Sequence, residues 1–283
     1  MNQTIVRTQG LTKQYGHHRA VSRISMHVRK GAVYGLIGRN GAGKTTFLKM
    51  LAGLASPSSG EIEIFGLRGK ELANVRSRIG CLIEAPGIYG NLSAYDNLDL
   101  KCRFFGIHKK GYIEEILKIV GLSDTGKKKT KHFSLGMKQR LGIGLALVGE
   151  PDLLLLDEPI NGLDPQGIVE IRDTILKLNK EKNMTIVISS HILEELSKIA
   201  TDYGIIHHGE LIEEITREEL MERCGERIEI ATGVPEQIVP ILDRLGIQQY
   251  QIVDSGHVWG FEKMARSALV NRELIRAGED ILE

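Results

Sequence analysis

The chain has 283 residues, and its 37 Lys and Arg residues almost cancel its 36 Asp and Glu residues, giving a net charge of +1. At about 100–200 residues per domain, this length suggests one large domain or two modest ones. The charge balance argues against a protein that binds nucleic acid by bulk electrostatics. The apolar share of 42% and the charged share of 26% are globular values, which argue against disorder.

The sequence indicates a soluble, cytoplasmic protein. Residues 1–10 have no basic start followed by a long apolar core, so they do not resemble a signal peptide. The most apolar stretch, 141–156, is interrupted by charged residues and a proline, and it is shorter than the roughly 18–20 residues that span a bilayer. The three cysteines are widely spaced and form no metal or redox motif, so we expect buried free thiols at Cys81, Cys102 and Cys224.

Short apolar runs alternate with amphipathic stretches, which is typical of α/β architecture. In chain order we predict strands over 32–37, 61–65, 79–83, 153–156 and 185–188, a helix over 45–54, and a helical region over 93–122. The pattern restarts near residue 225, where we predict a strand over 227–230, a helix over 234–245, a hairpin from 251–253 and 257–261, and a helix over 263–277. This order predicts a small α+β accessory domain.

The strongest motif is Gly-Arg-Asn-Gly-Ala-Gly-Lys-Thr, which fits the phosphate-binding pattern G-x-x-x-x-G-K-[ST] between a predicted strand and a predicted helix. Its glycines allow backbone N–H groups to surround phosphate oxygens, and the helix N-terminus adds positive potential. We expect Lys44 to reach the β- and γ-phosphates and the Thr45 hydroxyl to bind Mg²⁺. A chance glycine turn is the alternative. The predicted nucleotide contacts are Gly38, Arg39, Asn40, Gly41, Ala42, Gly43, Lys44, Thr45 and Thr46.

A second motif places two carboxylates after four leucines, at residues 157 and 158. Ligands bind at the carboxyl ends of strands in open α/β sheets, so we expect Asp157 to complete the Mg²⁺ shell and Glu158 to polarise the attacking water. A solvated acidic turn is the alternative. Guanine specificity is set aside, because Asn179-Lys180-Glu181-Lys182 begins like a guanine-reading motif but lacks its Asp.

Between these motifs lies Phe133-Ser-Leu-Gly-Met-Lys-Gln-Arg140, and with it the chain resembles an ABC-type ATPase subunit. The family signature is usually Leu-Ser-Gly-Gly-Gln; Ser134 and Gly136 are retained here, whereas Leu135 and Met137 depart from it. A plain helix cap is the alternative for this stretch alone. The resemblance implies a P-loop NTPase core over 1–224, with a helical subdomain at about 85–150 and the accessory domain over 225–283.

Further residues occur in the order that this family shows. Tyr15 resembles the aromatic residue that stacks on adenine, and Asn161–Asp164 resembles the loop that joins two nucleotide sites across a dimer. His191 resembles the switch histidine near the γ-phosphate, which gives it a catalytic role beside Glu158 and Lys44. Taken singly, Tyr15 would be core packing and His191 a helix-start residue.

Glu84 stands where the family normally has a glutamine that links the Mg²⁺ site to the membrane half of the transporter. A carboxylate binds metal more strongly than an amide but cannot donate a hydrogen bond. With the signature and the C-terminal extension, Glu84 makes the chain resemble the ATPases of bacitracin and lantibiotic self-protection exporters. Lineage drift without meaning for the substrate is the alternative.

The resemblance implies an ATP- and Mg²⁺-dependent subunit of a bacterial exporter for antimicrobial peptides or similar amphipathic compounds. Its partners would be a second copy or a paralogous ATPase, and a separate integral-membrane permease that docks near 84–105 and holds the subunit at the inner face of the membrane. No nucleic acid is expected. Another exporter class, a soluble ABC ATPase without a transport role, and a non-enzymatic ATP-gated module are the alternatives.

Two groups of charged or titratable residues have no assigned role. The run Lys127, Lys128, Lys129 and Lys131 is interpreted as a solvated loop, with contact to nucleotide, lipid or a partner as the alternative. The pairs His17-His18 and His207-His208 lack a third ligand at metal spacing and are interpreted as loop histidines.

Overall fold

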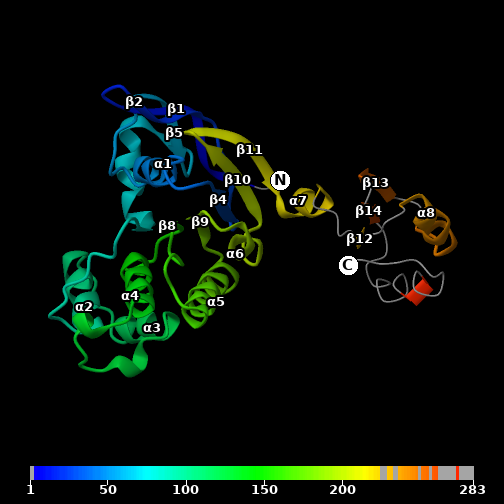
Figure 1. The fold of residues 1–283 in the computed structure, drawn as a ribbon. Helices are drawn as coiled ribbons and strands as arrows, with labels where there is room; N and C mark the ends of the chain where they lie inside the picture. Colours follow the sequence, from blue (N-terminus) through cyan, green and yellow to red (C-terminus); the bar gives the residue numbers. More distant parts are fainter. Residues whose placement is uncertain are drawn as a thin grey trace. The chain divides into compact units, whose positions relative to one another are not determined.

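The computed structural model describes residues 3–223, 228–231, 235–247, 250–254, 257–260 and 272–273 (Figure 1). The chain divides into two compact units, Met1–Arg217 and Glu218–Glu283, which are described separately below. Among the described residues, no helix combines the length and the apolar character needed to cross a membrane.

The first unit is built on a six-stranded sheet whose strands follow the order β11-β10-β4-β9-β8-β7. Five of these strands run parallel, and β11 pairs antiparallel with β10 at one edge. The interior strands are almost wholly buried, which is why they read as continuous apolar runs in the sequence. The strand bounds are Val33–Ile37 (β4), Ile79–Leu82 (β7), Leu153–Asp157 (β8), Thr185–Ser190 (β9), Asp202–His207 (β10) and Glu210–Thr216 (β11).

A second sheet of the same unit is antiparallel, with β2, β1, β5 and β6 in that order and β3 paired to β1. Its strands are Thr4–Tyr15 (β1), His18–Ile24 (β2), His27–Arg29 (β3), Ser59–Ile64 (β5) and Leu67–Arg68 (β6). Helix α1 (Lys44–Leu51) contributes Phe47, Leu48 and Leu51, which are completely buried in the core shared by strands of both sheets.

Three helices form a lobe at one end of the unit (Figure 1): α2 (Ala94–Phe104), α3 (Tyr112–Ile119) and α4 (Leu135–Leu147). Ser93 caps α2 in a capping box with Asp96, and Ser134 caps α4 by accepting from the Met137 N–H. In the chain, helix α5 (Pro165–Lys182) follows β8 and helix α6 (Leu193–Ser197) follows β9. Asp164 caps α5. Short 3-10 helices occur at Gly69–Arg78, Ser123–Thr125 and Thr130–His132.

The described part of the second unit contains a three-stranded sheet in the order β12-β14-β13, against which helix α8 packs. Its elements are β12 (Ile228–Ala231), α8 (Pro235–Arg244), β13 (Tyr250–Asp254) and β14 (His257–Gly260), with α7 (Arg217–Arg223) at the junction of the two units. The unit has a core of its own, formed by Ile230, Ile238, Ile241, Leu242, Ile247 and Val258.

All the strands predicted from the sequence are present, and the antiparallel pairing of β13 with β14 confirms the hairpin. The region 93–122 is two helices, since Gly106 and Gly111 adopt positive φ angles between them. The expectation of buried cysteines is confirmed at Cys102 and is wrong at Cys81, which is exposed. Cys224 lies outside the described residues, as do all but two residues of the helix predicted over 263–277.

Candidate nucleotide-binding site

The glycine-rich loop connects the end of β4 to the start of α1, as predicted. Gly41 and Gly43 have positive φ angles of 81° and 104°, and Gly43 is the N-cap of α1. A Cβ atom at Gly38 would lie 2.5 Å from the Ile206 carbonyl oxygen, and one at Gly43 would lie 2.4 Å from that of Ala20. Glycine is therefore required at both positions, by close backbone approach and at Gly43 also by conformation.

Lys44 is buried, with 5% of its surface exposed, and its ammonium group is held by this loop. Its Nζ donates to the Gly38 and Arg39 carbonyl oxygens at 2.6 and 3.2 Å and lies 3.0 Å from Glu158 Oε1. A buried charge needs such partners. The loop therefore fixes a positive charge beside its own N–H groups, which suits phosphate binding.

Asp157 ends β8 and joins the loop to the neighbouring strand. Its Oδ2 accepts from the Thr45 hydroxyl at 2.7 Å, and its Oδ1 accepts from the Ser189 hydroxyl at 2.7 Å. One carboxylate and one hydroxyl, both oxygen donors, are the ligand type that Mg²⁺ prefers, so Thr45 and Asp157 fit a magnesium ion. No role was predicted for Ser189, whose place opposite Asp157 follows from the parallel register of β8 and β9.

Glu158 has a φ angle of 46°, in the left-handed region that residues other than glycine rarely adopt. Its N–H donates to the Ser189 hydroxyl at 3.0 Å, and its carboxylate lies between Lys44 and His191. His191 Nδ1 lies 2.9 Å from Glu158 Oε2. The structure therefore brings the three predicted catalytic side chains, Lys44, Glu158 and His191, into one cluster.

An open pocket of about 560 Å³ adjoins this cluster and extends to the turn between β10 and β11. Gly209 N–H donates to the Ala42 carbonyl oxygen at 2.9 Å, which holds the turn against the loop. His207 and His208, with ring centroids 4.1 Å apart, are therefore neighbours of the phosphate-binding loop, although no local sequence signal places them there. The pocket is lined by Arg39, Asn40, Gly41, Ala42, His191, His207 and His208.

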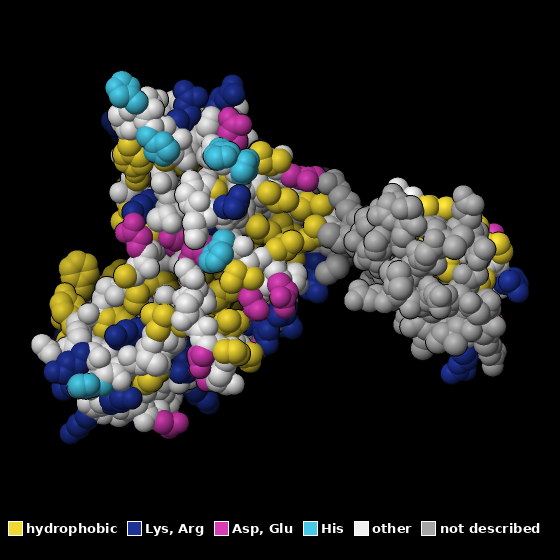
Figure 2. All heavy atoms as spheres, in the orientation of Figure 1, with side chains coloured by type: hydrophobic (Ala, Val, Ile, Leu, Met, Phe, Trp, Pro, Cys, Tyr) yellow, Lys and Arg dark blue, Asp and Glu magenta, His cyan; other side chains and the backbone are white. Residues whose placement is uncertain are grey.

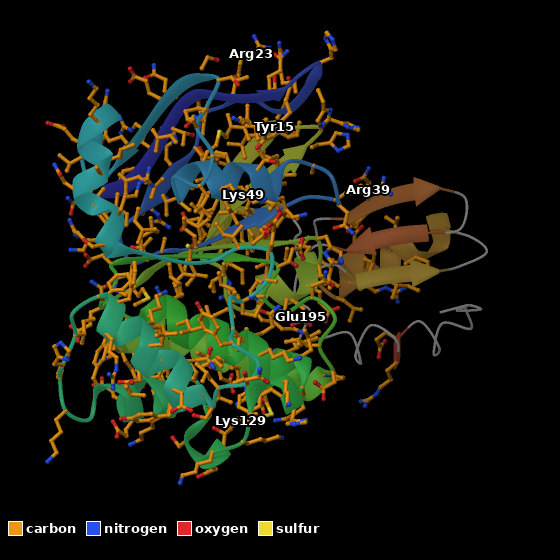
Figure 3. The ribbon with its side chains drawn as sticks, turned by 90° about the vertical axis from the view of Figure 1, so that its left-hand side faces the viewer. Tyr15, Arg23, Arg39, Lys49, Lys129 and Glu195 are labelled. Carbon is orange, nitrogen blue, oxygen red and sulfur yellow. The ribbon has the colours of Figure 1, made fainter. Side chains whose placement is uncertain are left out.

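The predicted residues outside this cluster fall in separate places. Tyr15 is the last residue of β1, and 50% of its surface is exposed (Figure 3). Lys13 Nζ lies 4.8 Å from the centroid of its ring. Thr46 follows Thr45 in the first turn of α1. Ser134 and Gly136 lie at the start of α4 on the helical lobe rather than in the cluster around Lys44.

Glu84 follows β7 and adopts a φ angle of 65°. Its carboxylate is 63% exposed and forms an ion pair with Lys49, which extends from the last turn of α1. In this arrangement Glu84 is held by Lys49, and its predicted role as a metal ligand beside Thr45 and Asp157 stays a prediction.

Comparison with known proteins identifies the family of this chain. The family model for ABC transporters matches residues 21–161. The chain is 44% identical over 282 residues to the bacitracin transport ATP-binding protein of Bacillus licheniformis, covering 99% of this chain and 92% of that protein. It is 47% identical over 208 residues to the lantibiotic transport ATP-binding protein of Streptococcus pyogenes, covering 74% and 89% of the two chains.

Two solved structures share this fold. One is the Clostridium perfringens cbiO1 protein, part of the ABC transporter complex cbiONQ, with a TM-score of 0.70 at 25% identity over 87% of this chain and 97% of that chain. The other is a dimeric ATP-binding cassette in a post-hydrolysis state with ADP and phosphate, with a TM-score of 0.68 at 25% identity over 75% and 99%. The chain belongs to the family of ABC transporter ATP-binding proteins.

Proposed function

We propose that the chain hydrolyses ATP to drive a membrane exporter whose permease is a separate protein. The observation that carries this proposal is the bonded cluster of Lys44, Thr45, Asp157, Glu158 and His191, which joins the ends of three parallel strands. Each of its side chains has a function in phosphoryl transfer, so a purely ATP-gated binding module would not need the full set.

The contacts indicate how the cluster would work. Loop N–H groups and Lys44 would bind the phosphates. Thr45 and Asp157 would hold Mg²⁺, which would neutralise part of the phosphate charge. Lys44 pairs with Glu158 in this structure. When ATP binds, the phosphate oxygens would replace Glu158 as the partner of the Lys44 ammonium group. Glu158 would then be free to accept a proton from water, and His191 would orient the Glu158 carboxylate through their contact.

We infer that the working form contains two ATPase subunits, either two copies of this chain or this chain and a paralogue. Ser134 is exposed at the N-terminus of α4, and Gly136 lies in its first turn, where a helix terminus favours anions. Since both residues lie on the helical lobe, they would complete the nucleotide site of a second subunit. The dimeric cassette with ADP and phosphate supports this arrangement.

The permease would dock in an apolar groove of about 500 Å³ between the end of β7 and helix α2. The groove includes Leu82, Ile83, Pro86, Tyr89, Leu100 and Phe104. Tyr89, Leu100 and Phe104 are all exposed, Phe104 to 88%, and a patch of large exposed apolar residues is typical of a protein-binding surface. Such docking would hold the subunit at the inner face of the membrane.

The names of the relatives support a peptide substrate. Two relatives that match most of this chain are a bacitracin and a lantibiotic transport ATP-binding protein. We therefore favour export of antimicrobial peptides or similar amphipathic compounds, with another exporter class as the alternative.

The proposed activity is tested with two variants of the purified chain. Glu158→Gln removes the proton acceptor but not the phosphate contacts, so it should keep ATP binding and lower turnover by about 10²-fold or more. Lys44→Ala removes the charge on the phosphates, so it should lose ATP affinity in calorimetry while keeping its fold.

Glu150→Gln is the matched control, because Glu150 is exposed and pairs with Lys109 outside the cluster. It should behave as the wild type in both assays. Wild-type turnover in Glu158→Gln would exclude Glu158 as the base, and wild-type affinity in Lys44→Ala would exclude the phosphate-binding assignment.

A further inference from the structure

We propose that the helical lobe binds the anionic lipid headgroups of the membrane beside the permease groove. This inference rests on the proposed function for its orientation and on the charges of the lobe for its chemistry. The contact surface is the lysine loop, defined here as Lys127, Lys128, Lys129 and Lys131, together with Lys109 and Lys110, which follow the far end of α2.

Basic charge is concentrated in this part of the chain. Residues 94–140 carry 11 Lys and Arg residues and 5 Asp and Glu residues, a net charge of +6. The rest of the chain carries 26 basic and 31 acidic residues, a net charge of −5. The near neutrality of the whole protein therefore conceals a strongly basic lobe, and Figure 2 shows dark-blue basic atoms over one side of it.

The positive charges of the lysine loop are not neutralised by carboxylates among the described residues. All four of its lysines are exposed, and among the described residues none has a carboxylate within ion-pair distance. Three of the five acidic residues in 94–140 are already held by other groups: Asp96 in the capping box of Ser93, Asp99 by Arg103, and Glu115 by Lys182.

Backbone contacts place the lysine loop next to the groove. Lys131 N–H donates to the Gly90 carbonyl oxygen at 2.9 Å, and Thr130 Oγ1 donates to the Tyr89 carbonyl oxygen at 2.9 Å. Tyr89 lines the groove and is 62% exposed. A protein docked in this groove would therefore have the lysine loop at its border, and Lys129 lies at the outer end of the lobe (Figure 3).

The far end of α2 repeats this combination of aromatic and basic residues. Phe104 is 88% exposed, and Lys109 and Lys110 follow it in an exposed turn. The eleven residues of α2 span about 16 Å, so exposed lysines border both ends of this helix.

The composition favours lipid over nucleic acid. Nine of the 11 basic residues in 94–140 are lysines, and both arginines, Arg103 and Arg140, are paired with Asp99 and Glu170. Arginine has the planar fork that suits nucleic-acid recognition, whereas lysine is a point charge on a flexible stem that suits a fluid layer of headgroups. Clusters of four to eight basic residues beside a membrane are known to attract anionic lipids.

The test measures binding of the full chain to lipid vesicles by co-sedimentation. Vesicles of phosphatidylcholine with about one third phosphatidylglycerol should bind the chain, and vesicles of phosphatidylcholine alone should not. Binding should weaken as salt rises, because the Debye length is only about 10 Å at 0.1 M. Equal binding to both vesicles would overturn the proposal.

The matched variants separate the lysine loop from general charge. Lys127/Lys129/Lys131→Gln should reduce vesicle binding at least about tenfold, with an unchanged melting temperature. Lys30/Lys70/Lys180→Gln removes the same charge from exposed lysines outside the helical lobe and should bind as the wild type. Equal losses in the two variants would show that only net charge matters and would overturn the proposal.

Two further outcomes would assign the surface to another partner. If duplex DNA at equal phosphate concentration binds the chain more tightly than the vesicles, the surface recognises nucleic acid. If the permease in pure phosphatidylcholine captures the chain with the same loss in the lysine-loop variant, the lysines contact protein. Either result overturns lipid binding.

Vesicle binding needs no turnover, so its failure is distinguishable from failure of the proposed ATPase. The Glu158→Gln variant should bind anionic vesicles as the wild type does. A chain that binds vesicles but hydrolyses no ATP would refute the proposed function alone, and one that hydrolyses ATP but ignores vesicles would refute this inference alone.

Discussion

Lys49 competes with the predicted metal site for the carboxylate of Glu84. The two side chains form an ion pair in which Lys49 is 30% exposed and Glu84 is 63% exposed. A pair this open contributes at most about 1 kcal/mol, so it holds Glu84 without locking it. The charge of Lys49 makes the Glu84 carboxylate less available to Mg²⁺.

Changing the two partners should therefore shift the magnesium requirement in opposite directions. Lys49→Gln releases Glu84 and should lower the half-saturating Mg²⁺ concentration for ATPase activity by up to about fivefold. Glu84→Gln removes the ligand and should raise it. The measurement is a Mg²⁺ titration of ATP turnover, with Lys30→Gln as an exposed-lysine control. Shifts in the same direction would show that Glu84 does not bind the metal.

Site residues that belong to contiguous motifs could be predicted from the sequence, and those that arrive from elsewhere could not. Lys44, Thr45, Asp157 and Glu158 lie in two short motifs, and the structure brings them within hydrogen-bond or ion-pair distance. Ser189 bonds to Asp157 only because β8 and β9 are adjacent. Lys49 and the His207-His208 pair likewise depend on tertiary neighbours, which carry no local signal.

The same contrast holds for the elements of the fold. Strands β4, β8 and β9 are buried on both faces, so each is a continuous apolar run that the sequence reveals. No strand was predicted at β1, β2, β3, β6, β10 or β11. Strand β1 mixes buried and exposed residues without strict alternation, and its pairings with β2, β3 and β5 all shift register. Such irregular strands lack the period of two that identifies a strand.

Helix α4 packs so closely on β7 that the contact depends on glycine. A Cβ atom at Gly80 would lie 2.1 Å from the Ala146 carbonyl oxygen, which belongs to the backbone of α4 and cannot turn aside. Gly80→Ala should therefore destabilise the protein by about 1–3 kcal/mol, as overpacking does, and lower the melting temperature by roughly 5 °C.

Gly87→Ala is the control for this substitution. Nothing lies within 4 Å of a Cβ atom at Gly87, and its φ angle is not positive. Alanine there should leave the melting temperature unchanged or slightly raised, because it restricts the unfolded chain. Equal melting temperatures for the two variants would mean that α4 and β7 can separate without loss of stability.

At the scale of the whole molecule, every predicted site residue belongs to the first unit. The core around α1 is built from residues between Ile5 and Ile206, and the second unit has its own core around Ile238 and Leu242. Arg217, the last residue of the first unit, is held to that unit by its N–H, which donates to the Thr201 carbonyl oxygen at 3.0 Å. Nucleotide binding should therefore not require the second unit.

A chain that ends at Arg223 tests this directly. It keeps the pairing of β10 with β11 and should melt cooperatively and bind ATP in calorimetry with the affinity of the full chain. A chain that ends at Gly209 is the control, because it loses β11 and with it Glu214, which accepts from Tyr34 Oη at 2.9 Å and from the His27 N–H at 2.8 Å. The control should lose stability, since it exposes the edge of β10 and leaves the buried Tyr34 hydroxyl without that partner. Weaker ATP binding by the Arg223 chain would instead show that the second unit supports the nucleotide site.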